Sequence, residues 1–433
     1  MRRLPSTTDR PGSKPTSTDP ALLPPAPSAP PRWAGREILD APETALVLNA
    51  VWSGDPAVVV PSPPGAGKTR LVALLAAALT DAAELRVGIA AQTRAQAVEI
   101  ARRVGILTDR AVLGWAADKP LPDVPGVQVA RGQMVSFPGE AGGVVIATTA
   151  RWMVSKPHIL ACDVMLVDEA WQATFGDIGA LGAFAPQIVC VGDPGQIAPV
   201  VTGSTDRWRS TPSGPHVPAP EALVAAHPAA VTTVALPHTW RLGPATTALI
   251  QPAFYPQLPF SSRRPAEHIE SPGGVLLPEI STRLVTVTGG STDPALIAAC
   301  ADRVRELIGH RHHTSRGVSA LAGDSIAVVC AHVSQAAAVR AALSAEPDVL
   351  VGTANQLQGL ERPAVVALHP LVGAREVSEF AADAGRACVM LSRHRSHVTV
   401  VMDAATPEIL AAADPALPGV AAQRTLTNTL LAT

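Results

Sequence analysis

A chain of 433 residues, 47% of them hydrophobic, is too long for one ordinary core, so two or more domains are expected. A formal net charge of −2 and a pI near 6.6 exclude a globally basic protein, so any nucleic-acid contact has to come from a local patch. The five cysteines form no C-x-x-C pair, which argues against structural zinc, an iron–sulfur cluster and a disulfide framework.

Residues 1–31 are rich in proline, serine and threonine and hold few large apolar side chains. Such a segment buries too little surface to offset its ordering entropy, so it is predicted to be a disordered tail, one through which a protein partner could be recruited. No apolar stretch follows the first arginines, and no run of about 18 apolar residues occurs anywhere in the chain. Neither secretion nor membrane spanning is expected, and a cytoplasmic location is.

From about Trp33, apolar runs alternate with helical patterns, which predicts a parallel α/β domain over residues 32–210. The predicted strands are Val58–Val60, Arg86–Ala90, Gly143–Ala147, Val164–Val167 and Gln187–Val191. Prolines between residues 107 and 137 suggest a small insertion, and the proline-rich residues 211–230 suggest a linker.

A second alternating series predicts a C-terminal α/β domain over residues 231–433. Its predicted strands lie near Ser325–Cys330, Val349–Val351, Ala364–Leu368 and His397–Met402, and its predicted helices near Ala295–Ile308 and Gln335–Leu343. The sequence therefore predicts two stacked α/β lobes.

The octapeptide SPPGAGKT, residues 62–69, lies between an apolar strand and an apolar helix, the context that a phosphate-binding loop requires. Glycines at 65 and 67 let backbone N–H groups point at phosphate oxygens, Lys68 can reach the β and γ phosphates, and Thr69 can bind Mg²⁺. The predicted nucleotide contacts of this loop are Pro64, Gly65, Ala66, Gly67, Lys68, Thr69 and Arg70. The alternative, a chance glycine-rich turn, leaves the coincidence of strand, loop and helix unexplained.

Two further strands end in polar residues suited to triphosphate hydrolysis. The run VMLVDEAWQ places Asp168 where a residue that holds Mg²⁺ is needed and Glu169 where a residue that activates water is needed. The run VGDPGQIAP places Gln196 within reach of a γ phosphate. Taken alone, the first pair could cap the next helix and the second run could be a polar turn.

DEAWQ followed by GDPGQIAP resembles motifs II and III of superfamily 1 helicases. The resemblance continues in order over residues 40–405. It is carried by AQTRAQA at 91–97, ATTA at 147–150, LPHTWRL at 236–242 with Phe254 and Tyr255 downstream, VVCAHVSQ at 328–335, GTANQLQGLE at 352–361 and GRACVMLSRH at 385–394. The DEA-x-Q and GD-x-x-Q forms are closer to superfamily 1B, whose members translocate 5′ to 3′.

The resemblance implies two tandem RecA-like parallel-sheet domains with an ATP cleft between them, and ATP and Mg²⁺ as ligands. It implies catalytic roles for Lys68, Glu169 and Gln196 and arginine-finger roles for Arg241 and Arg393. The resemblance also assigns Gly359 and Glu361 to the nucleotide, and Thr93, Thr149 and Thr353 to single-stranded DNA or RNA. With 3% aromatic residues, a base-stacking platform is poorly supplied, so backbone tracking is the expected mode of contact.

The leading hypothesis is an ATP-dependent helicase or single-strand translocase. One alternative is a nucleic-acid-stimulated ATPase that remodels nucleoprotein without unwinding, and another is an ATP-gated switch module that clamps a protein partner. A P-loop nucleotide kinase is the weakest alternative, since it leaves the second-lobe motifs unexplained. The basic run His310 to His313 is interpreted as a solvated loop because no acidic or Cys partner is spaced for zinc.

Overall fold

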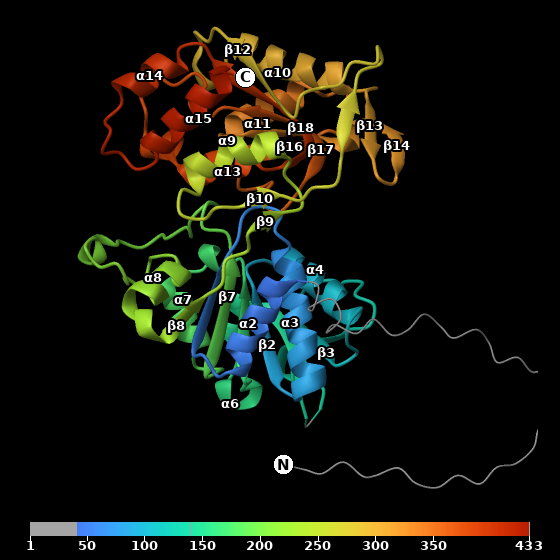
Figure 1. Cartoon of the computed structure of the whole chain (residues 1–433), viewed down its shortest axis with the longest axis vertical. Coiled ribbons are helices and arrows are strands. Elements are labelled where there is room, and N and C mark those ends of the chain that lie inside the picture. Colours follow the sequence, from blue (N-terminus) through green and yellow to red (C-terminus); the bar gives the residue numbers. More distant parts are fainter. Residues whose placement is uncertain (1–40, 140, 433) are drawn as a thin grey trace, which may run out of the picture.

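The structure is a computed structural model that describes residues 41–139 and 141–432. The predicted disordered tail, residues 1–31, lies outside the described residues. Figure 1 shows two lobes stacked along the long axis, with the N-terminal half of the chain in the lower lobe and the C-terminal half in the upper one.

The first lobe is built on one eight-stranded sheet in which all neighbouring strands are parallel, in the order β4-β3-β5-β2-β6-β7-β1-β8. Its strands are β1 (Ala57–Pro61), β2 (Arg86–Ala91), β3 (Ala111–Trp115), β4 (Gln128–Arg131), β5 (Gly143–Thr148), β6 (Val164–Asp168), β7 (Gln187–Gly192) and β8 (Val231–Thr233). The apolar runs are almost wholly buried because helices cover both faces, as is usual for parallel sheets.

Helices α2, α3 and α4 pack on one face of this sheet, and α5, α7 and α8 on the other, which gives the lobe two separate apolar layers. The bounds are α2 (Pro42–Trp52), α3 (Lys68–Ala83), α4 (Arg94–Gly105), α5 (Thr149–Met153), α6 (Pro157–Leu160), α7 (Phe175–Leu181) and α8 (Ala219–Ala226).

The structure corrects the predicted insertion at residues 107–137. This segment supplies β3 and β4, which extend the main sheet beyond β5, and all five residues of β3 are buried. The proline-rich stretch between the two strands is a loop, tied down where Trp115 Nε1 donates to the carbonyl of Pro120. The strands are only four and five residues long, so the surrounding prolines hid them from pattern analysis.

The predicted linker at residues 211–230 is also corrected. It contains α8, whose Ala219, Ala222 and Leu223 side chains are buried against the first lobe, and it leads directly into β8, which pairs with β1. The first lobe therefore extends to Thr233, and the C-terminal domain does not begin at residue 231. The apolar side chains within this proline-rich run supply the burial that a free linker would lack.

The second lobe has a five-stranded parallel sheet in the order β12-β18-β17-β15-β16. Its strands are β12 (Ile280–Val285), β15 (Ile326–Cys330), β16 (Leu350–Thr353), β17 (Arg362–Leu368) and β18 (His394–Asp403). The helices are α9 (Pro244–Phe254), α10 (Pro294–Leu307), α11 (Val333–Ala342), α12 (Glu379–Ala382), α13 (Ala384–Leu391), α14 (Thr406–Ala412) and α15 (Val420–Ala432). The predicted class, α/β with two tandem parallel-sheet lobes, is confirmed.

Two small sheets complete the fold. Strands β9 (His238–Thr239) and β10 (Ser261–Ser262) lie where the lobes meet, while β11 (His268–Glu270), β13 (Arg311–Thr314) and β14 (Gly317–Ala320) form an antiparallel sheet at one side of the second lobe (Figure 1). The basic run at 310–313 is thus largely strand β13, not a solvated loop, and His310 and His312 are buried. Within the described residues, no helix combines the length and apolarity needed to cross a membrane.

Candidate nucleotide-binding site

The phosphate-binding loop connects β1 to α3 as its sequence predicts. Gly65 and Gly67 have φ angles of +75° and +89°, in the left-handed region where a side chain is disfavoured. Nothing lies within 4 Å of a Cβ placed on Gly67, so the requirement there is backbone conformation and not space. Ser62 fixes the start of the loop, since its N–H and hydroxyl both donate to the carbonyl of Gly192, at 2.9 and 2.7 Å.

The segment that leaves the first lobe packs directly on this loop. The hydroxyl of Thr239 donates to the carbonyl of Pro64 at 2.6 Å, and Trp240 N–H donates to the carbonyl of Gly65 at 2.9 Å. A Cβ on Gly65 would lie 2.3 Å from Cβ of Arg241. Gly65 therefore serves a second purpose, because only glycine allows Arg241 to approach the loop this closely.

Lys68 begins α3 and is 8% exposed. Its ammonium lies 3.9 Å from a carboxylate oxygen of Glu169 and 3.6 Å from one of Asp193. A buried ammonium requires such anionic partners, and a phosphate would be another. The loop thus brings Lys68 and Glu169 together as the sequence analysis expects.

Thr69 and Asp168 offer two oxygen donors side by side, with the threonine hydroxyl 3.1 Å from the carboxylate. Burial, reinforced by the charge of Glu169, raises the pKa of Asp168 well above its usual range. A hydroxyl and a carboxylate that lacks solvation suit a hard divalent cation, which would stabilise the ionised form of Asp168. The donor set therefore fits Mg²⁺. Glu169 adopts a φ of +52°, a strained conformation for a residue other than glycine and one that clusters at functional sites.

Asp193, which the sequence analysis did not single out, lies at the centre of the site. It is 1% exposed, and its carboxylate accepts hydrogen bonds from Gly195 N–H at 3.0 Å, from the Gln196 amide and from the Tyr255 hydroxyl at 2.7 Å. The signal was present in the GD-x-x-Q pattern directly after a buried strand. Gln196 does lie at this site. Its side-chain amide nitrogen donates to Asp193, and its side-chain oxygen accepts from the Gln358 amide at 3.1 Å.

The loop after β7 is clamped by the second lobe. A Cβ on Gly195 would lie 2.3 Å from the Tyr255 ring, and a Cβ on Gly385 would lie 2.5 Å from the carbonyl oxygen of Gln196. Together with the Gln196–Gln358 hydrogen bond, these contacts connect the loop that holds Asp193 to the end of α9, to α13 and to the turn after β16. A change in the packing between lobes would therefore act directly on the partners of Lys68.

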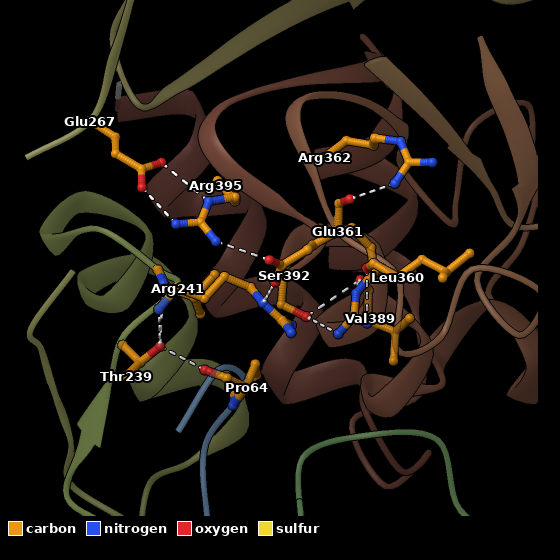
Figure 2. Close-up of polar contacts among 12 residues, drawn as sticks. Pro64, Thr239, Arg241, Glu267, Leu360, Glu361, Arg362, Val389, Ser392 and Arg395 are labelled. Carbon is orange, nitrogen blue, oxygen red and sulfur yellow. Dashed lines mark hydrogen bonds and ion pairs between the residues drawn. The ribbon is translucent and has the colours of Figure 1, made fainter. Parts of the chain in front are cut away.

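Arg241 belongs to a chain of charges that runs from the phosphate-binding loop into the second lobe (Figure 2). Its guanidinium pairs with Glu361, which also accepts from Arg395 at 3.0 Å, and Arg395 pairs with Glu267 at 2.6 Å. Burial by itself would raise the pKa of Glu361, but the positive charges of Arg241 and Arg395 hold it below its usual range. The predicted finger Arg241 and the predicted nucleotide contact Glu361 are thus brought together.

Arg393 is 2% exposed, yet among the described residues no carboxylate lies within ion-pair distance of it. Its guanidinium donates instead to the carbonyl of Val389 at 3.0 Å and to the hydroxyl of Ser392 at 2.9 Å. Burial, with the positive charge of Arg241, lowers the pKa of Arg393 to about 10. A buried cation satisfied only by neutral acceptors is costly, and an anionic ligand would remove that cost.

The remaining predicted residues differ in how available they are. The Thr93 hydroxyl caps α4 and accepts from Gln96 N–H at 3.2 Å, so it is used locally. Thr149 and Thr353 are buried, and their hydroxyls bond to nearby backbone. All three threonines stand at the carboxyl ends of parallel strands, which places their backbones on the expected edges even though their hydroxyls are occupied.

The outer parts of the site are more open. Arg70 lies exposed in the first turn of α3, Ala66 is partly buried in the loop, and Gly359 has a φ of +83° in an exposed turn. Trp240, beside the phosphate-binding loop, is 54% exposed and was not singled out by the sequence analysis. The sequence did not reveal that the backbone of Trp240 lies against this loop, because the contact between Thr239 and Pro64 that holds it there spans 175 residues.

Two stacked parallel sheets with a phosphate-binding loop facing the junction define a P-loop NTPase with two RecA-like lobes. Residues 39–211 match the model of the AAA domain family. The match spans most of the first lobe and includes its phosphate-binding loop. No curated protein sequence matches the chain significantly.

Solved structures similar in fold include three helicase structures of arterivirus type. The PRRSV helicase is 16% identical with a TM-score of 0.43 over 83% of this chain and 54% of its own. Arterivirus nonstructural protein 10, described as a helicase, is 14% identical with a TM-score of 0.46 over 83% and 61%. Its complex with DNA is 15% identical with a TM-score of 0.42 over 83% and 62%. The chain thus spans between half and two thirds of these proteins.

Proposed function

We propose that this protein is an ATP-driven motor of the superfamily 1 helicase type, which couples ATP hydrolysis to movement along single-stranded DNA or RNA. The observation that carries the proposal is Arg393, a buried guanidinium of the second lobe that donates only to neutral acceptors, the carbonyl of Val389 and the hydroxyl of Ser392. A cation that lacks an anionic partner, close to a phosphate-binding loop of the other lobe, fits a γ phosphate bound at the junction.

In this proposal each charged group has a distinct role. Lys68 moves from its carboxylate partners to the β and γ phosphates, and Glu169 orients and deprotonates the attacking water. Arg241 and Arg393 stabilise negative charge that develops on the transferring phosphoryl group. Thr69 and Asp168 would hold Mg²⁺, which when bound would neutralise phosphate charge.

The second lobe would respond to nucleotide through two sets of contacts. Asp193, Gln196 and Gln358 connect the loop after β7 to the second lobe, and Glu361 connects Arg241 to the same lobe. Loss of the γ phosphate would remove the anion that these groups share. Opening of the junction would then shift one lobe relative to the other.

Trp240 supports a site for the nucleotide base. Its backbone N–H bonds to the phosphate-binding loop and its side chain is exposed, and stacking on an indole suits any purine. The resemblance favours ATP over GTP, although residues 41–60 hold no glutamine that could read adenine.

Single-stranded nucleic acid would cross the carboxyl edges of both sheets, where Thr93, Thr149 and Thr353 offer backbone groups to phosphates. A polarity of 5′ to 3′ follows from the resemblance to superfamily 1B alone. The alternative is a nucleic-acid-stimulated or protein-directed ATPase that remodels complexes without separating duplex.

Steady-state ATP hydrolysis tests the proposal directly, measured without polymer, with single-stranded DNA and with single-stranded RNA. Lys68→Ala and Glu169→Gln should abolish hydrolysis, whereas Lys156→Ala, an exposed lysine before α6, should match the parent. Stimulation by one polymer would support the motor and identify its track. Hydrolysis that neither polymer changes would refute the motor and favour a protein-directed ATPase.

A further inference from the structure

The carboxyl edge of the first sheet is divided into two halves. The nucleotide site occupies the ends of β6, β7 and β1, and the ends of β2, β5, β3 and β4 form the other half. Figure 1 shows β3 at the side of the lower lobe opposite β8. Because these strands are parallel, the residues that follow them meet along one edge about 14 Å long, three strand spacings of about 4.8 Å.

Each of these four strands is followed by a basic residue or ends in one. Arg131 is the last residue of β4, and Lys119 lies in the loop after β3. Arg151 lies in α5 directly after β5, and Arg94 begins α4 after β2. The pairing of Trp115 with Arg131 keeps the ends of β3 and β4 level. We call this row of four cations the basic edge.

Backbone carbonyls hold two of the guanidinium groups in place. Arg131 donates to the carbonyl of Lys119, and Arg151 donates to the carbonyl of Gly132 at 2.6 Å. The Nε atoms of Arg131 and Arg151 are buried and have no hydrogen-bond partner. A carbonyl fixes the position of a guanidinium but does not neutralise its charge. The residues of β3 and β4 are thus connected to α5 with their positive charges uncompensated.

The basic edge has few carboxylates to balance it. Among the described residues, only Lys119 of the four has a carboxylate within ion-pair distance, Asp118 at 3.1 Å. Both side chains of that pair are largely exposed, so the pair contributes little. A hydrogen bond from Lys119 is the main cause that lowers the pKa of Asp118, and the charge of Arg94 adds to it, so Arg94 lies near the same carboxylate. Four cations facing one carboxylate leave the edge positive.

A single strand of nucleic acid fits this edge better than other anions do. A row of cations along the ends of neighbouring strands suits a linear polyanion. Arg94 directly follows Thr93, and Arg151 lies close after Thr149 on α5. The basic edge is therefore continuous with the two threonines of this lobe that were predicted to contact a strand. Since the whole chain has a net charge of −2, a strand needs such a local patch.

We propose that Arg94, Lys119, Arg131 and Arg151 form a surface that binds the phosphates of single-stranded DNA or RNA. The inference rests on the proposed function and extends its track outward, from the ends of β2 and β5 over those of β3 and β4. Residues 111–131, part of the predicted insertion, would supply half of this surface. Phosphate contacts carry no base preference, which agrees with the low aromatic content of the chain.

The test is the affinity of the full-length protein for fluorescein-labelled dT and rU oligonucleotides across a salt series. The variant combines Arg94→Ala with Lys119→Ala, because within the described residues neither side chain bonds to backbone as those of Arg131 and Arg151 do. Each phosphate contact contributes about 0.7 to the slope of log K against log salt, so the slope should decrease by about 1.4. The same relation predicts binding about 25-fold weaker at 0.1 M salt.

A matched control removes the same charge from the far end of the same helix. Arg102 and Arg103 are exposed in the last turn of α4, at the opposite edge of the sheet from Arg94. Arg102→Ala combined with Arg103→Ala should keep the parent's affinity and slope. Lys119→Arg should also keep the slope, because the positive charge is retained. Calorimetric melting temperatures of all variants separate a loss of binding from a loss of folding.

The possible outcomes distinguish the surface from the proposed function. If the parent binds a strand and the Arg94 and Lys119 variant binds it equally well, the surface alone is refuted. Equal losses in variant and control would show a long-range effect of net charge and would also overturn the surface. A parent that binds neither strand refutes the proposed function together with the surface. If that parent binds labelled poly-glutamate and the variant does not, the edge serves an acidic protein partner instead.

Discussion

Replacement of Tyr255 by phenylalanine should uncouple the phosphate site from the second lobe. The hydroxyl of this residue, 2% exposed, donates to Asp193 at 2.7 Å and lies 3.1 Å from the sulfur of Cys388. Asp193 in turn faces Lys68 at 3.6 Å. Tyr255 directly follows α9 of the second lobe, so one hydroxyl connects the lysine's carboxylate partner to the other lobe.

The size of the effect follows from the kind of bond lost. A hydrogen bond to a charged group contributes about 1.5–3 kcal/mol, and a buried carboxylate left with one donor fewer carries that cost in full. Asp193 would keep the Gly195 N–H and the Gln196 amide, so the loss should fall within that range. Since Asp193 would be free to turn, hydrolysis should slow while nucleotide affinity changes little.

Differential scanning calorimetry and steady-state ATPase kinetics measure both effects. Tyr255→Phe should lower the melting temperature and reduce kcat more than it raises KM. Cys388→Ala, which removes only the weak sulfur partner of the hydroxyl, serves as the control and should have a smaller effect on kcat. A variant with the parent's melting temperature and kcat would refute the argument that this hydroxyl fixes Asp193.

Three other predictions concern Arg241, the junction of the lobes and the buried histidines. Glu361→Gln removes the carboxylate that fixes Arg241, and kcat should fall about 10- to 100-fold, as expected for a misplaced catalytic group, with an unchanged kcat as the contrary result. Gly385→Ala would place a Cβ 2.5 Å from the carbonyl oxygen of Gln196, so it should destabilise the protein by about 1–3 kcal/mol in calorimetry, whereas Gly179→Ala, with nothing within 4 Å, should not. The free energy of unfolding, measured with urea, should fall by about 2 kcal/mol for each buried histidine from pH 6.5 to pH 5. The reason is that an unfolded imidazole binds a proton in this range and a buried one does not; a flat profile would contradict this. Burial lowers the pKa of His369 to about 4, of His394 to about 3 and of His397 to about 4.

Local pattern was sufficient for the parts of this protein that are contiguous in sequence. The phosphate-binding loop needs glycines at fixed spacing between a strand and a helix, and all of these lie within residues 57–83. Asp168 and Glu169 follow a buried strand directly, and so their place at the carboxyl edge of the sheet was predictable. The same logic predicted most strands of both lobes, since buried parallel strands are short apolar runs.

Pattern failed where a short apolar run stood among prolines. Strands β3 and β4 and helix α8 have four to eight residues each, too few to establish a period against the surrounding turn signals. Burial against existing elements stabilised them in the folded chain. An insertion and a linker were therefore predicted where the sheet and its covering helix continue.

By itself, the sequence determined the phosphate-binding loop, the two carboxylates after β6 and the order of two α/β lobes, because each depends on residues close together in the chain. Only the tertiary structure decided which distant side chains meet. Tyr255 reaches Asp193 across 62 residues, Arg241 reaches Glu361 across 120, and Gln358 reaches Gln196 across 162. Contacts at such separations depend on how the lobes pack, and no local spacing encodes them.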